Sequence, residues 1–214
     1  MTGRHSNCTL LARDLACARG DRNLFEGVRF ELSNGSLLRV AGANGSGKTT
    51  LLRTVCGLLN PANGRVEWNG EAIDTLGEDY HRALAYVGHS NGVKDELSVI
   101  ENLRFAARLA GLEADERAMA GALNEFSIDS LSRIQCRILS QGQKRRVALA
   151  RLRLSRARPL WVLDEPFVAL DAAGIGIVHK LIEEHSAGGG LVILTTHQEI
   201  PLSASSSQRI ELQA

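Results

Sequence analysis

Aromatic residues and long apolar runs are both scarce in this chain of 214 residues. Phe, Trp and Tyr together make up 4% of it, which leaves few rings for stacking on nucleic-acid bases. No run of about 18 apolar residues occurs, so the sequence predicts no transmembrane helix. The first segment, Met1–Cys8, is polar and lacks the apolar core of a signal peptide. We therefore expect a protein that stays in the cytoplasm.

Cysteine pairs and an excess of charge are missing as well. The four cysteines, Cys8, Cys17, Cys56 and Cys136, form no C-x-x-C pair, and no His-rich tract lies near them. This excludes the usual zinc, redox and covalent-haem motifs and favours reduced, mostly buried thiols. The net charge of +1 argues against a dedicated nucleic-acid-binding protein.

The order of apolar patterns predicts an α/β protein. Short apolar runs bounded by turn residues predict strands, and they lie at Thr9–Ala16, Val28–Leu32, Leu37–Val40, Arg65–Trp68, Ala83–Val87, Leu160–Leu163, Leu191–Thr195 and Arg209–Leu212. The run Leu160–Leu163 has no polar residue, which is typical of a buried strand in a parallel sheet. Helical spacing at Leu51–Leu59 and Asp171–His185 predicts helices between strands.

A helical stretch interrupts this order. The sequence Ser-Val-Ile-Glu at 98–101 has the spacing of a capping box, in which the Ser hydroxyl accepts an amide and the Glu reaches back. Helical patterns then continue to about Leu154. We therefore expect a single domain over residues 1–214, with an α/β core and a helical subdomain inserted at about residues 90–155.

Residues 42–49 form the strongest motif. Their sequence, Gly-Ala-Asn-Gly-Ser-Gly-Lys-Thr, matches the phosphate-binding pattern G-x-x-x-x-G-K-[ST] between a predicted strand and a predicted helix. Glycines let the backbone wrap closely around phosphates, and a helix N-terminus directs amides at them. Lys48 is expected to reach the β- and γ-phosphates of ATP, and the Thr49 hydroxyl to bind Mg²⁺. The candidate nucleotide contacts are Gly42, Ala43, Asn44, Gly45, Ser46, Gly47, Lys48, Thr49 and Thr50.

Two acids end the buried strand that begins at Leu160. Open α/β sheets bind ligands at the carboxyl ends of their strands, so Asp164 and Glu165 are expected to lie beside the phosphate loop. Asp164 is the second candidate ligand of Mg²⁺. Glu165 is the candidate general base that polarises the attacking water. The acid pair alone is a weak signal, and the phosphate loop upstream makes it a strong one.

The segment after Ile138 distinguishes among phosphate-loop proteins. Leu-Ser-Gln-Gly-Gln at 139–143 and the basic helix after it resemble the LSGGQ signature of ABC-type ATPases. A Ser hydroxyl at a helix N-terminus offers donors to an anion. Val168–Asp171 resembles the D-loop of that family. His197 resembles the histidine that contacts the γ-phosphate in that family.

The resemblance to ABC-type ATPases implies a fold and an assembly. The fold would be that of a P-loop NTPase, with a RecA-like α/β core, an antiparallel β subdomain and the inserted helical subdomain. Ser140, Gly142 and Gln143 would bind the ATP held by a second copy, so two chains would enclose two MgATP as a homodimer. The candidate catalytic residues are Lys48, His89, Glu165 and His197.

Some positions depart from the general pattern of the family. Arg19 stands where an aromatic residue usually stacks on adenine, and a guanidinium can also stack on a purine. His89 stands in place of the glutamine of the Q-loop, and an imidazole can still donate or accept a hydrogen bond there. Gln141 replaces the first signature glycine, and Val168 replaces the D-loop serine. Because the core catalytic groups remain, we expect an active ATPase.

Through these departures, together with Trp161 and the Thr-Thr-His-Gln sequence at 195–198, the chain resembles the ATP-binding subunits of cytochrome c maturation systems. That resemblance implies a peripheral subunit on the cytoplasmic face of the bacterial inner membrane. Its partner would be an integral membrane subunit of the CcmB type, with CcmC as a second candidate. The work done would be haem export or the release of a haem-loaded chaperone, although no haem-binding motif is present in this chain.

Residues 144–158 allow a rival interpretation, because they contain seven basic residues and no acid. Such a run could bind nucleic acid or anionic lipid, or it could be the solvated face of the signature helix. The near-neutral charge of the whole chain favours the second, so no nucleic-acid partner is expected. The alternative functions are an ABC subunit of another small importer or exporter, a soluble ABC ATPase acting on nucleic acid, and a P-loop kinase.

Overall fold

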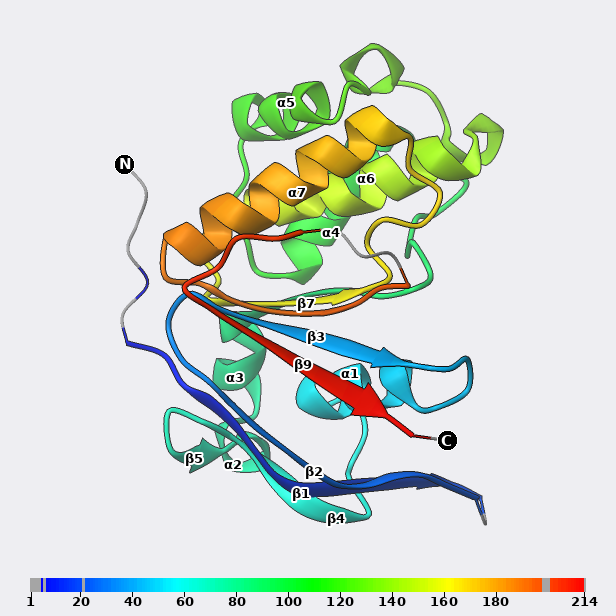
Figure 1. The fold of residues 1–214 in the computed structure, drawn as a ribbon. Coiled ribbons are helices and arrows are strands. Elements are labelled where there is room, and N and C mark those ends of the chain that lie inside the picture. The colour runs from blue at the N-terminus through cyan, green and yellow to red at the C-terminus, as the bar shows by residue number, and fades with distance from the viewer. Residues whose placement is uncertain (1–4, 6, 21, 198–200, 214) are drawn as a thin grey trace.

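The computed structural model describes residues 5, 7–20, 22–197 and 201–213. Two sheets lie one above the other with helices between and beyond them (Figure 1). One sheet has five parallel strands in the order β6-β7-β8-β3-β9, with bounds Ser36–Gly42 (β3), Leu84–Val87 (β6), Leu160–Asp164 (β7), Leu191–Thr195 (β8) and Ser206–Leu212 (β9). This sheet confirms the predicted α/β core and its apolar strands.

The second sheet is antiparallel. Its order is β2-β1-β4-β5, with bounds Leu10–Arg19 (β1), Arg22–Leu32 (β2), Asn63–Trp68 (β4) and Glu71–Ala72 (β5). Helix α1, Lys48–Val55, lies between the two sheets (Figure 1) and packs Leu51, Leu52 and Val55 into the apolar core that they share. The phosphate loop, which joins β3 to α1, is therefore held between two packed layers.

Helices cover the other face of the parallel sheet (Figure 1). They are α4 Val99–Leu109, α5 Glu116–Glu125, α6 Gln141–Leu154 and α7 Ala172–Ala187, with short 3-10 turns at Asp129–Leu131 (η1) and Cys136–Ile138 (η2). Alternate residues of β7 explain the layering, because Leu160 and Val162 point into the core with α1, whereas Trp161 and Leu163 point into the core with α4–α7. The four cysteines are buried thiols, as predicted.

Two local features differ from the sequence-based expectations. Helix α1 ends at Val55 and does not continue to Leu59, because Gly57 has a φ of +71° and the amide of Leu58 donates to the carbonyl of Arg53. This is the usual glycine-terminated helix end, and apolar spacing alone does not reveal it. Two short helices between β5 and β6, α2 Ile73–Leu76 and α3 Glu78–Ala83, were not predicted because each is too short for a periodic pattern.

Candidate functional site

The phosphate loop has the backbone that the glycine pattern predicted. Gly42 has a φ of +142°, and a Cβ there would lie 2.6 Å from the carbonyl oxygen of Leu212 in β9. Gly47 has a φ of +97° and caps helix α1, and a Cβ there would lie 2.9 Å from the ring of Phe25. Both positions therefore require glycine, for conformation and for space. The Lys48 ammonium donates to the carbonyls of Gly42 at 2.7 Å and Ala43 at 3.0 Å, which holds the charge across the loop.

Asp164 connects the phosphate loop to the end of strand β7. Its side chain accepts a hydrogen bond from the Thr49 hydroxyl at 2.8 Å and another from the Thr195 hydroxyl at 2.7 Å. The residue is only 2% exposed. The two carboxylate oxygens of Asp164 thus have different partners, since one is bonded to Thr49 of helix α1 and the other to Thr195 of β8. Parallel pairing of β7 with β8 sets Asp164 directly beside Thr195.

Glu165 follows Asp164 in a left-handed backbone conformation, with a φ of +50°. Its amide donates to the Thr195 hydroxyl at 2.8 Å. One carboxylate oxygen lies 3.3 Å from Nε2 of His197, within ion-pair distance but without the alignment of a hydrogen bond. Thr195 therefore positions both acids, a role that the sequence analysis did not assign. A hydroxyl residue at the end of an otherwise apolar buried strand was the available signal.

Most of these residues line one cleft of about 520 Å³, whereas the predicted phosphate contacts Gly42, Ala43 and Ser46 are not part of its lining. It brings together the phosphate loop, both acids and the two histidines that the sequence analysis selected. The lining residues are Leu24, Asn44, Gly45, Gly47, Lys48, Thr49, Thr50, His89, Asp164, Glu165, Val168 and His197. The candidate adenine contact, the side chain of Arg19 at the end of β1, lies outside the described residues.

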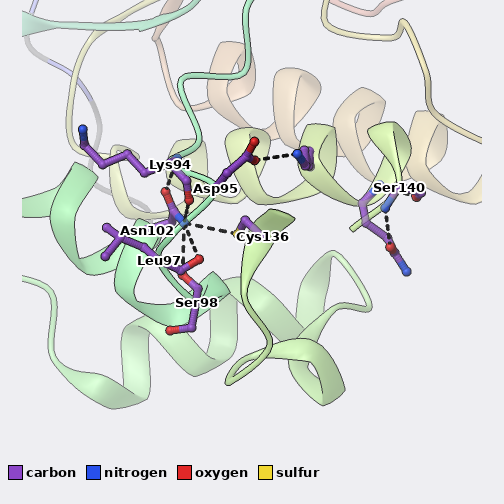
Figure 2. Close-up of polar contacts among 9 residues, drawn as sticks. Lys94, Asp95, Leu97, Ser98, Asn102, Cys136 and Ser140 are labelled. Atoms are coloured by element: carbon purple, nitrogen blue, oxygen red, sulfur yellow. Dashed lines mark hydrogen bonds and ion pairs between the residues drawn. The ribbon is translucent and has the colours of Figure 1, made fainter. Parts of the chain in front are cut away.

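The segment from His89 to Leu97 is held at its far end by a buried side chain of α4, Asn102. The Asn102 amide oxygen accepts from the amide of Lys94 at 2.7 Å, and its nitrogen donates to the carbonyls of Lys94 and Leu97 at 2.9 and 3.2 Å. The same nitrogen lies 3.2 Å from the sulfur of Cys136 in η2 (Figure 2). The end of this loop is therefore fixed to α4 and to the turn that leads to the signature.

The signature residues occupy a different pocket of the same chain. Ser140 caps α6, where its hydroxyl accepts a hydrogen bond from the amide of Gln143 at 3.2 Å. The backbone amide of Ser140 donates in turn to the side chain of Gln143 at 2.9 Å (Figure 2). A Cβ at Gly142 would lie 2.8 Å from the carbonyl oxygen of Ala169, so the D-loop packs against the signature. Ser140, Gly142 and Gln143 line a pocket of about 460 Å³ and not the cleft around Lys48.

The basic residues at 144–158 bind acids and carbonyls of this same chain, which argues against their interpretation as a nucleic-acid surface. Lys144 pairs with Asp95 at 2.5 Å (Figure 2), and Arg146 pairs with Asp171 at 2.6 Å. The other five basic residues also contact acids or carbonyls of this chain, namely Arg145 (Gly88, Asn91, Asp164, Glu165), Arg151 (Asn91), Arg153 (Glu125), Arg156 (Glu184) and Arg158 (His81, Leu84, Ala110).

An apolar groove of about 590 Å³ lies on another side of the helical layer. Its lining includes Phe105 of α4, 39% exposed, together with Leu109, 74% exposed, and Leu58, 55% exposed. From the segment His89–Leu97, the lining includes Gly92, whereas His89 lines the phosphate cleft. One loop thus contributes to both the cleft and the groove.

A parallel sheet with a phosphate loop, a neighbouring acid pair and a second, capped signature pocket defines the class of the protein, a P-loop ATPase of the ABC type. The family model described as "ABC transporter" matches residues 25–168. The chain is 31% identical to a solved structure titled "Structure of ATP binding subunit of ABC transporter", with a TM-score of 0.79 over 88% of this chain and 79% of that one. A dimeric ATP-binding cassette bound to ADP and Pi has a TM-score of 0.77 at 21% identity over 88% of each chain, which supports the fold alone.

Curated relatives identify one group within this class of ATPases. The chain is 49% identical to the cytochrome c biogenesis ATP-binding export protein CcmA of Nitrosospira multiformis, over 95% of this chain and 98% of that protein. It is 50% identical to the CcmA protein of Aromatoleum aromaticum, over 91% of each chain. The chain therefore belongs to the ABC transporter family and, within it, to the CcmA group of ATP-binding proteins. The predicted ATPase fold and ATP-binding function are confirmed.

Within the described residues, no helix combines the length and the apolar character that are needed to cross a membrane.

Proposed function

We propose that this chain hydrolyses MgATP in the cleft around Lys48 and thereby drives a membrane partner in cytochrome c maturation. The observation that carries the proposal is the convergence of the loop lysine, both acids and both histidines on one cleft. Lys48 binds the β- and γ-phosphates as a point charge, and the loop amides bind the phosphate oxygens. Glu165 accepts the proton of a water that attacks the γ-phosphorus, while the bond from that phosphorus to the bridging oxygen of ADP breaks.

His197 and His89 complete the cleft in this proposal. His197 lies within ion-pair distance of Glu165 and is 55% exposed at its side chain, so it can contact the γ-phosphate and still adjust when the cleft closes. His89 approaches from the loop after β6 and lines the same cleft. Its imidazole takes the position of the Q-loop glutamine as a hydrogen-bonding group.

Thr49 and Asp164 fit the requirements of a magnesium site. Their oxygens lie 2.8 Å apart at the edge of the cleft, and hydroxyl and carboxylate oxygens are the ligands that Mg²⁺ prefers. When bound there with ATP, the ion would neutralise charge on the β- and γ-phosphates. The second carboxylate oxygen of Asp164 is held by Thr195, which fixes the orientation of the site.

The proposed active form contains two copies. Ser140, Gly142 and Gln143 line a pocket apart from the cleft of their own chain, so they serve the ATP of a second copy. The D-loop supports this arrangement because Val168 lines the cleft while Ala169 lines the signature pocket. Val168 is 46% exposed, an apolar side chain that a partner copy would cover.

The membrane partner is proposed to be a subunit of the CcmB type, with CcmC as a second candidate, on the cytoplasmic face of the inner membrane. The groove beside Phe105 and Leu109 provides an exposed apolar surface for a segment of that partner. The CcmA relatives named above are described as cytochrome c biogenesis export proteins. The driven step is haem delivery or the release of a haem-loaded chaperone.

The test of the cleft is Glu165→Gln. Because the base is lost while the phosphate contacts remain, the variant should bind MgATP normally and hydrolyse it about 10²- to 10⁴-fold more slowly. It should also run as a dimer with ATP and mostly as a monomer without it. Near-normal turnover would remove Glu165 from the role of base. Monomeric behaviour in saturating MgATP with the membrane partner present would contradict the composite site.

The pathway is tested separately by deleting the gene and staining for covalent haem in c-type cytochromes. Loss of the stain, restored by the wild-type gene but not by the Glu165→Gln gene, supports the assignment. Normal cytochrome maturation in the deletion strain would overturn the pathway and leave the ATPase assignment standing.

A further inference from the structure

Arg145 is a buried cation of the signature helix that the mechanism above does not use. It is 3% exposed, and it lies five residues after the cap of α6 at Ser140. Its two terminal nitrogens have four acceptors, none of them on α6. Burial lowers the pKa of Arg145, and the charges of Asp164 and Glu165 act in the opposite direction.

The four acceptors belong to two segments that reach the cleft, the loop around His89 and the end of β7. One nitrogen donates to the carbonyl of Gly88 at 3.0 Å and to the side chain of Asn91 at 3.2 Å, on the two flanks of His89. The other donates to the carbonyls of Asp164 at 3.0 Å and Glu165 at 2.7 Å. A single planar group thus connects the His89 loop with the end of β7. A guanidinium suits this position because its donors diverge in a fixed fork.

The contact with Glu165 is made where the backbone is strained. A residue other than glycine with a φ of +50° is uncommon and persists only when its surroundings hold it. The amide of Glu165 is held by Thr195 at 2.8 Å, and its carbonyl is held by Arg145 at 2.7 Å. The conformation of this backbone sets the direction of the Cα–Cβ bond of Glu165 and so limits where its carboxylate can point relative to His197.

We infer that Arg145 is a positioning residue for ATP hydrolysis, which holds the peptide of Glu165 in its left-handed conformation and makes that conformation depend on the His89 loop. A shift of Gly88 or Asn91 would therefore displace the guanidinium that holds the carbonyl of Glu165. The inference rests on the proposed role of Glu165 as the base and adds a residue that acts through it.

The neighbours of Arg145 on α6 do not share these contacts. Lys144 pairs with Asp95, and Arg146 pairs with Asp171, and neither bonds to the acid pair or to the residues that flank His89. Arg145 is buried, whereas Lys144 and Arg146 are only partly buried. The Nε of Arg145 has no hydrogen-bond partner within the described part of the chain. A buried donor without a partner destabilises the fold, so stability alone is a poor explanation for an arginine here.

The experiment compares Arg145→Met and Arg145→Lys with a control, Arg153→Met, which removes the same charge from the same helix but loses only an ion pair with Glu125. Steady-state kinetics should give a kcat at least about tenfold lower for Arg145→Met, with KM and MgATP affinity within about twofold of wild type. Arg145→Lys should recover part of kcat, because an ammonium can reach the two carbonyls of Asp164 and Glu165. Arg153→Met should keep wild-type kinetics.

A double variant that combines Arg145→Met with Glu165→Gln distinguishes a positioning role of Arg145 from a general structural defect. If Arg145 acts through Glu165, the double variant should be no slower than Glu165→Gln alone. Multiplied losses, a rise in KM at constant kcat, or an equal loss in Arg153→Met would each overturn the inference. A wild-type protein without ATPase activity would instead overturn the proposed function.

If Arg145→Met does not fold, Asn91→Ala provides the same test. It removes only the contact between the Asn91 side chain and Arg145, since the carbonyl of Asn91 still accepts from Arg151 at 2.7 Å. Its kcat should fall about threefold or more at constant KM, and the fall should disappear in the Glu165→Gln background. An unchanged kcat, or a fall that persists in that background, would overturn the inference.

Discussion

A buried histidine stack should make the stability of this protein sensitive to mild acid. His185 of α7 is 4% exposed, and its ring stacks on Trp161 at a centroid distance of 4.0 Å with 7° between the planes. The ring of His5 meets the ring of His185 edge-on, at a centroid distance of 5.1 Å. A Cβ at Gly190 would lie 2.2 Å from Nε2 of His185, so little room remains for water. The site favours a neutral imidazole.

The pKa of His185 falls from 6.5 to about 3, chiefly because of burial and then because of nearby His5, while the backbone of Pro159 and Leu191 acts in the opposite direction. Below pH 6.5 the unfolded chain therefore binds a proton that the folded chain does not. The stability contributed by neutral His185 is fully present above that pH and is lost progressively as the pH falls towards 3. Lowering the pH from about 7.5 to about 5 should cost about 2 kcal/mol through this group alone.

The measurement is urea unfolding at both pH values, for the wild type and for His185→Phe. The phenyl ring keeps the stack on Trp161 and cannot take a proton. Its larger size costs stability at every pH, so the quantity compared is the change between the two pH values. Wild type should lose about 2 kcal/mol more than the variant, while His5 and the acids titrate in both. Equal pH-dependent losses in the two proteins would refute the reasoning.

Two further predictions concern the cleft and the loop beside it. Lys48→Ala should weaken MgATP affinity by about tenfold or more and reduce turnover to background, since the charge that the loop carbonyls hold is lost; unchanged affinity and rate, measured by equilibrium binding and phosphate release, would make the loop structural only. Lys94→Glu should block cytochrome maturation while isolated ATPase activity stays within about twofold, because Lys94 contacts the ring of Phe105 at 5.1 Å beside the groove. Asp95→Lys should reduce both, because Asp95 pairs with Lys144 of the signature helix. A Lys94→Glu protein that loses ATPase activity, or that supports normal maturation, would contradict this division.

The parts of the site that the sequence predicted are those coded by short, local patterns. The phosphate loop, the acids at the end of β7 and the capping boxes at Ser98 and Ser140 each depend on residues a few positions apart. His197 was selected by its place after a predicted strand. The structure brings it to 3.3 Å from Glu165, whereas its catalytic role stays a prediction.

The parts that the sequence did not reveal depend on residues far apart in the chain. Arg145 reaches Gly88 across 57 positions and Glu165 across 20, and a basic helix offers no sign of which cation turns inward. Thr195 meets Asp164 only because β7 and β8 are neighbours in the sheet. The stack of His185 on Trp161 likewise requires the packing of α7 on β7, so the sequence alone gave His185 no special role.

The loop after β6 is anchored at its two ends to different helices. From Lys94 onwards it is bonded to Asn102, so this part must follow α4. At the other end, Gly88 is bonded to Arg145 and follows α6 and the acid pair. Gly92, with a φ of +59°, lies between these anchors and lines the groove. Asn91 is also bonded to α6, through Arg145 and Arg151. Gly92 and Val93 are therefore the residues that would absorb a displacement of α4 relative to α6. The groove and the cleft are thus joined by one short loop, and under the proposed function the stiffness of Gly92 and Val93 would set how much of a movement of α4 reaches His89.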